Sequence, residues 1–406
     1  MNDSKIINDP VFGFIKIPHG LLLDIVNHPL MQRLTRIKQL GLTCVVYPAA
    51  QHTRFQHSIG AFHLMSEAVS SLMQKGIFIF DSEAEAIEAA ILMHDIGHGP
   101  FSHVLENTLI HGISHEEISL MIMEQINQDM NGELNLAMKI FKDEYPKRFL
   151  HQLISSQLDM DRLDYLRRDS FFTGVTEGDI GSARIIKMLD VIDDQLVVNS
   201  KGIYSIENYL VARRLMYWSV YLQKTTVACE KMLLNVLLRA KDLVQQGIEV
   251  FAPPALHYFL RHHVDAPFFN SHPEALQNYE ELDDSDIWSS LKVWCHHEDK
   301  ILALLARDLI ERRIFRVEVH EEQVSEDAIR ELQEKLAAKV NVSVDDARYL
   351  MSTNLIQKDM YDMNDDHISI LGKDGSVRDI TDASELFNIA LLSKKNRKYY
   401  LCYQRF

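Results

Sequence analysis

Cysteine is scarce in this sequence, and the few that occur are scattered. The four cysteines, Cys44, Cys229, Cys295 and Cys402, lie far apart and form no CxxC pair. A disulfide framework needs many cysteines in a short chain, and a thiolate zinc site needs closely spaced pairs. The sequence therefore predicts neither, and it fits a reducing, cytoplasmic environment.

Long apolar runs are also lacking. No stretch approaches the roughly 18 to 20 apolar residues that span a bilayer. The opening residues MNDSKIINDPVFG show no basic flank leading into an apolar segment. We therefore expect neither secretion nor membrane insertion.

Positive charge is in short supply. Lysine and arginine total 42 against 58 aspartates and glutamates, which gives a formal net charge of -16. Such a surface generally repels duplex nucleic acid, so we do not expect nucleic-acid binding. An anionic substrate would have to be held locally, by a metal ion or by a few placed cations.

What the sequence has in abundance is helical periodicity, from about residue 21 to 243. In AEAIEAAILMHD the apolar residues share one face, and Ser82 followed by Glu85 predicts a capping box. The glycines and proline of GHGP predict the end of this helix. The pair His94 and Asp95 is thus expected on its last turn.

The character of the chain changes near its end. IFRVEV and YYLCYQRF predict strands, SEDAIRELQEKLAAK predicts an amphipathic helix, and HISILGKDGSVRDI predicts a hairpin that turns at Asp374 and Gly375. The predicted fold is mainly α, with a helical core over residues 1–311 and a small α+β unit over residues 312–406.

Histidine is concentrated in one region. Eight of the 19 histidines fall between His52 and His115, far more than an even spread would give. In HDIGHGPFSH, His94 and Asp95 come at a helix end, and two glycines let the backbone approach a ligand closely. With His57 of HTRFQHS they could bind a metal ion. Alternatively, these side chains cap and satisfy buried groups in a helix-to-loop corner.

An oxygen donor would suit a Lewis-acid site for phosphate chemistry. The segment SSQLDMDRLDYLRRDS offers Asp159, Asp161, Asp164 and Asp169, of which the second and third share a helix face. Spacing alone leaves open a solvated, charged helix whose carboxylates pair with neighbouring arginines.

Several motifs occur together in a familiar order. They are KIINDPVFGFI, RLTRIKQLG, YPAAQHTRFQHSIG, HDIGHGPFSH, SHEE and LDMDRLDYLRRDSFFTG. Over about residues 5 to 245 the chain resembles the HD-domain deoxynucleoside triphosphate triphosphohydrolases, which include the mammalian sterile-alpha-motif and HD-domain enzyme and bacterial relatives. The resemblance implies an HD-domain helical core that hydrolyses a dNTP to a deoxynucleoside and inorganic triphosphate.

The resemblance also implies a divalent metal ion held by His57, His94, Asp95 and Asp161. It thereby selects Asp161 among the acidic residues of its segment. Mixed imidazole and carboxylate ligands do not name the ion, so Mn²⁺, Mg²⁺, Fe²⁺, Zn²⁺ and Ni²⁺ all remain admissible.

Five further positions match the family's catalytic residues. Arg54 would touch the α-phosphate, and His98 and His103 would face the scissile bond. His115 would serve in acid catalysis, with Glu116 beside it.

A larger set would bind the nucleotide. In the family, two arginines hold phosphates, two tyrosines lie at the sugar, one of them excluding a 2′-hydroxyl, and an aspartate and a glutamine reach the 3′-hydroxyl. The matching residues are Arg162, Arg213, Tyr165, Tyr221, Asp169 and Gln39 with its neighbour Leu40, together with Tyr217, which replaces a histidine of the family's pocket.

The chain departs from the family at its regulatory guanine site. Asn27 and Thr35 stand where the family has an aspartate and an arginine, although Lys5, Asn8 and Gln32 fit. This argues against activation by GTP in the family's manner. Relatives form dimers or tetramers with KIINDPVFGFI at the shared interface, so the resemblance also implies a homo-oligomer.

Two other functions stay open. The same core could act on another nucleotide or phosphate ester, or it could be a non-catalytic nucleotide sensor whose metal site serves only binding. A sensor would be expected to have lost a ligand or the acid, and the chain retains all of these residues.

Overall fold

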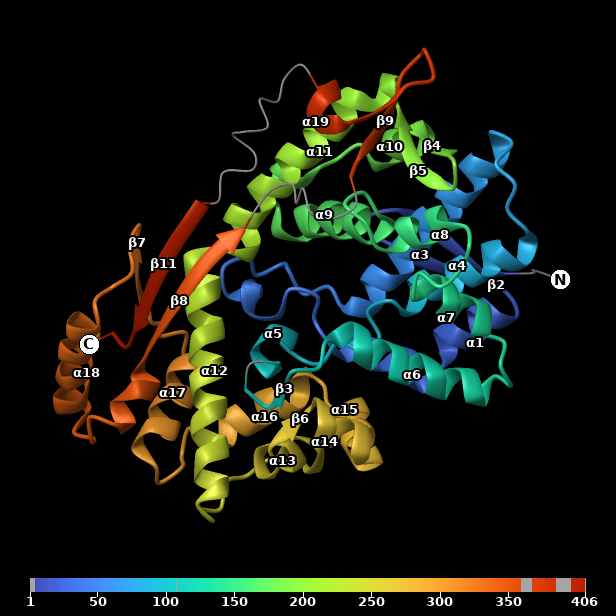
Figure 1. Cartoon of the computed structure of the whole chain (residues 1–406). Helices are drawn as coiled ribbons and strands as arrows, with labels where there is room; N and C mark the ends of the chain where they lie inside the picture. The colour runs from blue at the N-terminus through green and yellow to red at the C-terminus, as the bar shows by residue number, and fades with distance from the viewer. Residues whose placement is uncertain (1–3, 107, 359–366, 385–395, 406) are drawn as a thin grey trace.

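The computed structural model describes residues 4–106, 108–358, 367–384 and 396–405. Helices dominate, and small sheets lie toward the C-terminus, which confirms the predicted fold class (Figure 1). No helix in these ranges is long and apolar enough to cross a membrane.

Three helices form the centre of the molecule. Helix α3 (Arg54–Gln74) packs against both α4 (Asp81–Met93) and α9 (Met160–Thr173). Around them lie a β1–β2 hairpin (Ser4–Asp9, Gly13–Pro18) and further helices: α1 (Leu21–Asn27), α2 (Pro29–Arg33), α5 (Ser102–Leu105), α6 (His115–Asp129), α7 (Asn135–Phe141), α8 (Arg148–Ile154) and α10 (Ser182–Met188).

Local capping decides where the central helices begin. Thr53 and Gln56 form a reciprocal capping box at the start of α3, which puts Arg54 and the following turn at the helix N-terminus. The Asp159 carboxylate accepts the Arg162 backbone N–H at 2.7 Å and so starts α9. Both devices are local in sequence and place candidate site residues on first turns.

The start of α4 differs from the sequence prediction. The expected capping box of Ser82 and Glu85 is wrong, because the helix already begins at Asp81. The Glu83 carboxylate instead accepts the Phe80 backbone N–H at 2.8 Å. Burial makes the difference: Glu83 is 1% exposed and is held by partners from a distant segment.

These partners make Glu83 a stability determinant. It pairs with Lys147 at 2.7 Å and accepts a hydrogen bond from the Tyr145 hydroxyl at 2.6 Å. Burial raises the pKa of Glu83, but Lys147 and Tyr145 outweigh it and hold the pKa below its usual value. The stabilisation is therefore present at neutral pH and is lost as the pH falls through that lowered pKa.

Glu83→Gln is expected to lower the free energy of unfolding by about 1–3 kcal/mol, because a charged hydrogen-bond network is broken in a buried position. Urea denaturation at neutral pH measures this value. The matched control is Glu85→Gln, since Glu85 lies two residues away on the same helix and is exposed. Equal losses in the two variants would contradict the assignment.

The second half of the chain is also helical. It contains α11 (Ile203–Met216), a single π-helical turn (Tyr217–Tyr221), α12 (Lys224–Gln245), α13 (Pro254–Arg261), α14 (Ala266–Ser271), α15 (Pro273–Glu281), α16 (Asp284–Trp294), α17 (Lys300–Ile310), α18 (Glu326–Val340) and α19 (Ile380–Ala383). The long α12 stands between the C-terminal elements and the core (Figure 1).

The strands predicted near the C-terminus are confirmed, but they join two different sheets. Strands β7 (Arg316–His320), β11 (Asn396–Tyr403) and β8 (Met351–Lys358) form an antiparallel sheet. The hairpin of β9 (Ser369–Leu371) and β10 (Val377–Asp379) instead adds to β5 (Gln195–Asn199) and β4 (Leu189–Ile192), with β9 parallel to β5. A short parallel pair, β3 (Ile110–His111) and β6 (Val264–Asp265), completes the set. The boundary after residue 311 stays a prediction.

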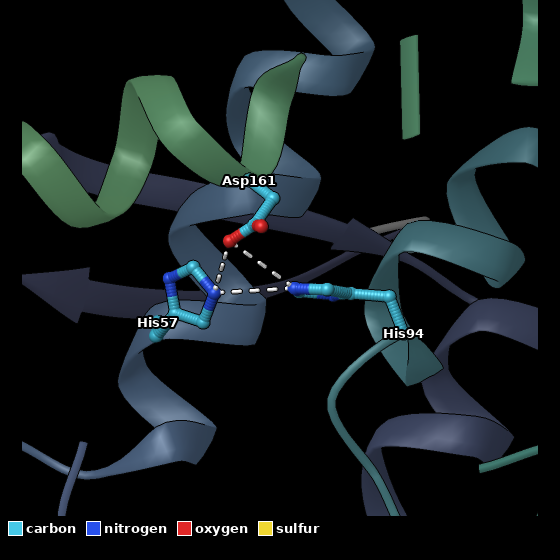
Figure 2. A group of neighbouring side chains, drawn as sticks. All are labelled: His57, His94 and Asp161. Carbon is cyan, nitrogen blue, oxygen red and sulfur yellow. Dashed lines mark hydrogen bonds and ion pairs between the residues drawn. The ribbon is translucent and has the colours of Figure 1, made fainter. Parts of the chain in front are cut away.

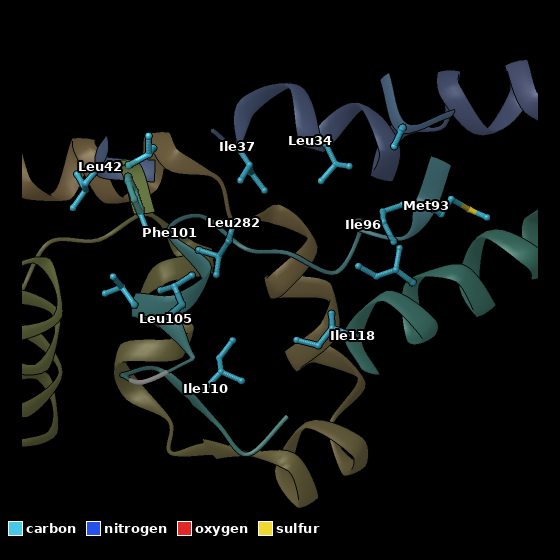
Figure 3. Packing of buried hydrophobic residues seen from close by; sticks show 14 of the residues in the cluster. Leu34, Ile37, Leu42, Met93, Ile96, Phe101, Leu105, Ile110, Ile118 and Leu282 are labelled. Atoms are coloured by element: carbon cyan, nitrogen blue, oxygen red, sulfur yellow. The ribbon is translucent and has the colours of Figure 1, made fainter. Parts of the chain in front are cut away.

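Apolar packing surrounds the turn that follows α4. Figure 3 shows Met93, Ile96 and Phe101 of this stretch among buried side chains from other elements, such as Leu34 and Leu282. The turn is therefore anchored on a core built from segments that lie far apart in the sequence. This anchoring positions the residues described next.

Candidate metal centre

His57 lies on the first turns of α3 and is fully buried. Its Nδ1 lies 2.7 Å from Asp164 Oδ2, so Nδ1 donates and Nε2 keeps its lone pair. Asp164 is fixed in turn by two hydrogen bonds from Arg168, each 2.9 Å long. Gly60 is required here, because a Cβ would lie 2.0 Å from Asp164 Oδ1.

His94 is oriented in the same way. It follows the last turn of α4, and its Nδ1 donates to the Ile91 carbonyl at 2.7 Å. This contact leaves Nε2 as the available lone pair. Two imidazoles from separate helices thus have tautomers suited to metal binding.

The two imidazoles meet a carboxylate from a third helix, as Figure 2 shows. His57 Nε2 and His94 Nε2 are 3.2 Å apart, and Asp161 Oδ1 lies 3.1 Å from the first and 3.5 Å from the second. Ligands about 2.1 Å from a metal ion, at angles near 90–110°, are about 3.0–3.4 Å apart. The three donors therefore fit one divalent ion.

Asp95 lies at the edge of this group. Its Oδ1 is 3.5 Å from His94 Nε2, and its Oδ2 is 3.6 Å from His57 Nε2. Oδ2 also accepts a hydrogen bond from Arg54 Nη1 at 2.6 Å. The four predicted ligands are thus together, with Arg54 directly beside them.

Electrostatics favour a cation at this point. Burial lowers the pKa of His57, but hydrogen bonds to Asp161 and Asp164 outweigh it and raise the pKa to about 10. Burial raises the pKa of Asp161, but His57 and His94 hold it well below its usual value. Without a metal ion, the proton on Nε2 supplies the positive charge that these carboxylates favour; a divalent ion would displace this proton and bind the lone pair of Nε2.

His98 and His115 lie side by side next to the cluster. Their rings stack with centroids 4.0 Å apart and planes 17° apart, and His98 Nε2 is 3.3 Å from Asp95 Oδ1. His115 opens α6, where Ser114 forms a capping box with Glu117. The near-parallel rings direct their lone pairs along separate planes, so they are poorly arranged to share one metal ion.

Glu106 supports His115 and was missed by the sequence reasoning. Its Oε1 lies 3.5 Å from His115 Nδ1, similar to the 3.6 Å between Glu116 Oε1 and His115 Nε2. Burial lowers the pKa of His115, but Glu106 and Glu116 raise it overall. His103 is different, because its side chain is 79% exposed and lies only at the edge of this group, 3.9 Å from Glu106.

The predicted sugar-binding residues also lie together. The Tyr221 hydroxyl donates to Asp169 Oδ2 at 2.7 Å, and the Tyr221 ring contacts those of Tyr165 and Tyr217 edge to face. His52, which the sequence reasoning did not single out, lies 2.7 Å from the other Asp169 oxygen. The π-helical turn Tyr217–Tyr221 carries two of these rings, and such turns are frequent at functional sites.

Several residues predicted to contact the nucleotide have buried polar atoms without partners. Within the described ranges, Arg213 Nε and Nη1, Arg54 Nε and Gln39 Oε1 are buried and make no hydrogen bond. Burial opposes the charge of Arg213, and so does nearby Arg162, although neighbouring tyrosines raise its pKa overall. Arg162 itself is held by Asp159 at 3.0 Å. Leu40 is half-buried beside Gln39.

An open cavity of about 440 Å³ lies at the Lys38–Thr53 bridge, and both of these residues line it. None of its lining residues is a predicted site residue: Thr35, Arg36, Lys38, Gln51, Thr53, Asp284, Ser285, Trp288, Ser289 and Lys292. The donor chemistry of the cluster, rather than the size of a hollow, therefore locates the candidate site.

Known proteins match this chain along most of its length. Residues 54–169 match the HD domain, and residues 180–267 match the HD associated region. An uncharacterized protein of Bacillus subtilis is 34% identical over 322 residues, which cover 78% of this chain and 72% of that protein. A Dictyostelium discoideum protein named as a deoxynucleoside triphosphate triphosphohydrolase SAMHD1 homolog is 30% identical, over 60% of this chain and half of its own length.

Two solved structures are similar to nearly the whole of this chain. A phosphohydrolase from Bacteroides thetaiotaomicron is 65% identical, with a TM-score of 0.97 over 99% of this chain and 100% of that one. A hypothetical protein from Aquifex aeolicus is 26% identical, with a TM-score of 0.73 over 99% and 97% of the two chains. Together with the His and Asp cluster at the end of α4, these matches show that the chain belongs to the HD-domain phosphohydrolases that carry an HD-associated region.

Proposed function

We propose that this chain hydrolyses deoxynucleoside triphosphates to a deoxynucleoside and inorganic triphosphate. The observation that carries the proposal is the guanidinium of Arg213, a half-buried residue whose Nε and Nη1 atoms are buried and make no hydrogen bond within the described ranges. A cation with buried, unused donors calls for an anionic ligand. Arg54, which bonds Asp95 at 2.6 Å, and Arg162, which lies near both Asp161 and Arg213, add the positive charge that a polyphosphate requires.

The sugar-binding side of the pocket supports a deoxynucleotide. The Tyr221 hydroxyl is tied to Asp169, and its ring is held edge to face by Tyr165 and Tyr217. In our proposal this fixed ring packs on the deoxyribose and excludes a 2′-hydroxyl, as the resemblance to the family implies. The Dictyostelium relative, named as a triphosphohydrolase of this kind, points to the same substrate class.

In the reaction, water attacks the α-phosphorus, the bond from phosphorus to the 5′-oxygen breaks, and the 5′-oxygen takes up a proton. A bound divalent ion supplies Lewis acidity and neutralises charge on the phosphoryl oxygens. The chain's own contributions are positive charge from Arg54, Arg162 and Arg213, and a proton held on His115. Glu106 and Glu116 favour the protonated form of that imidazole, as an acid requires.

The absence of GTP activation, predicted from Asn27 and Thr35, is part of the proposal. The Thr35 hydroxyl donates to the Gln32 carbonyl at 2.6 Å, and Asn27 accepts a hydrogen bond from Lys5 at 3.3 Å. A threonine cannot replace the charge of the arginine found in the family. We therefore propose that turnover needs no GTP; the dimer or tetramer stays a prediction.

The test is turnover of each of the four dNTPs, singly and mixed, with Mn²⁺ or Mg²⁺, and with ATP as the ribonucleotide comparison. Anion-exchange chromatography identifies the products. Triphosphate plus deoxynucleoside from single dNTPs, with little turnover of ATP, is the expected result. No turnover under any mixture, with metal shown to be bound, would shift the assignment to another phosphate ester or to a nucleotide sensor.

A further inference from the structure

The turn between α4 and α5 carries Asp95 and His98, and its backbone carbonyls are bonded by side chains from distant segments. The turn contains Gly97 and Gly99, so it has little conformational restraint of its own. It has a few local hydrogen bonds, such as that from the His98 N–H to the Asp95 carbonyl at 3.1 Å, and contacts from outside the turn add to them.

Arg33 supplies one set of contacts. It lies at the end of α2, is 1% exposed, and donates from Nη1 to the His98 carbonyl at 2.9 Å and to the Ile96 carbonyl at 3.5 Å. Nε and Nη2 donate to the carbonyls of Leu282 and Tyr279 at 3.0 and 3.1 Å. A buried cation bonded to four carbonyls, two in the turn and two near the end of α15, ties these segments together.

Ser119 of α6 also holds the turn, because its hydroxyl accepts the Gly97 N–H at 2.9 Å and donates to the His94 carbonyl at 3.0 Å. Tyr279 of α15 supplies a third set of contacts. It is 4% exposed, its hydroxyl donates to the Gly97 carbonyl at 2.7 Å, and its ring lies 5.1 Å from the Arg33 guanidinium. A Cβ on Gly99 would lie 2.9 Å from the Tyr279 hydroxyl. The turn and the tyrosine are thus fitted closely to each other.

We propose that Tyr279 and Arg33 are positioning residues that clamp the turn, and so fix Asp95 and His98 relative to the metal cluster. Tyr279 and Leu282 lie outside residues 54–169 and 180–267, the segments that match the family. Through this clamp, α15 contributes to positioning the candidate site residues. This proposal rests on the proposed function, in which Asp95 and His98 act in catalysis. A shift of such groups by about 1 Å can lower the rate about 100-fold, so contacts that hold the turn in place would affect turnover.

Tyr279→Phe tests the clamp, since it removes only the hydroxyl and preserves the packing of the ring. Amide exchange in the peptide 94–101 of the metal-loaded protein is expected to accelerate about tenfold, because one hydrogen bond to a buried carbonyl is lost. With dNTP substrate, kcat should fall about tenfold while KM changes less than about twofold. The matched control is Tyr258→Phe on α13, because the buried Tyr258 hydroxyl has no partner within the described ranges.

A second variant pair tests the close fit directly. Gly99→Ala alone places a methyl group against the Tyr279 hydroxyl, so kcat should fall. Because Tyr279→Phe removes that same hydroxyl, the double variant should lose less kcat than the product of the two single losses. Exchange and kcat unchanged in Tyr279→Phe, or equal losses in Tyr258→Phe, would overturn the clamp. Faster exchange in Tyr279→Phe, with a wild type that turns over no dNTP, would retain the clamp and reject the proposed function.

Discussion

Asp161→Asn should yield a folded protein that binds divalent metal at least about 100-fold more weakly than the wild type and has no measurable turnover. Asp161 contacts both imidazoles of the cluster, at 3.1 and 3.5 Å, and its side chain is 30% exposed. Losing its charge therefore removes a metal ligand without opening a cavity in the core. Calorimetric titration with Mn²⁺ and elemental analysis of the loaded protein measure the loss.

The control for this variant must be another aspartate whose side chain does not contribute to the stability of the fold. Asp164 is unsuitable, because it is fully buried between His57 and Arg168, and its loss would leave a buried arginine poorly paired. Asp179 is exposed and lies outside the cluster, so Asp179→Asn should leave binding and turnover unchanged. Wild-type metal affinity in Asp161→Asn would exclude Asp161 as a ligand.

Arg213→Met should lower kcat/KM for dNTPs by about 10- to 100-fold, because charged hydrogen bonds to the substrate are lost. The free energy of unfolding should stay the same or increase, since the variant removes a half-buried cation whose Nε and Nη1 are buried and unpaired. Opposite signs for activity and stability distinguish a ligand-binding residue from a structural one. Steady-state kinetics and urea denaturation measure the two effects.

The neighbouring Arg214 offers a matched control. Arg214 follows Arg213 on α11 and is partly exposed, and none of its buried atoms lacks a partner within the described ranges. Arg214→Met should therefore change kcat/KM by less than about twofold. A marked loss of stability in Arg213→Met, with activity unchanged, would contradict a role in substrate binding.

Much of the fold could be predicted from local pattern. Periodicity gave the long helix α12, and the turn residues Asp374 and Gly375 gave the β9–β10 hairpin. The partner of that hairpin could not be predicted, because its parallel pairing with β5 joins segments far apart in the sequence. The start of α4 was misplaced for a similar reason, since Lys147 and Tyr145 hold Glu83 from a distant segment.

The candidate site divides in the same way. Linked motifs in the sequence pointed to His57, His94, Asp95 and Asp161, and the structure brings all four together. The residues that orient the histidines of the site were harder to predict from the sequence. Glu106 lies outside the motifs, and Asp164 was one of several acidic residues with equal claims on spacing alone.

The sequence by itself determined the mainly helical fold, the first turns that carry Arg54 and His115, and the residue types of a metal-dependent phosphohydrolase. These features depend on capping and periodicity, which act over a few residues. Only the tertiary structure decided that Asp164 orients His57, that Arg213 has unused donors, and that Tyr279 bonds the turn at Gly97. Each of these depends on burial and on contacts between residues far apart in the chain, and neither quantity can be read from local sequence.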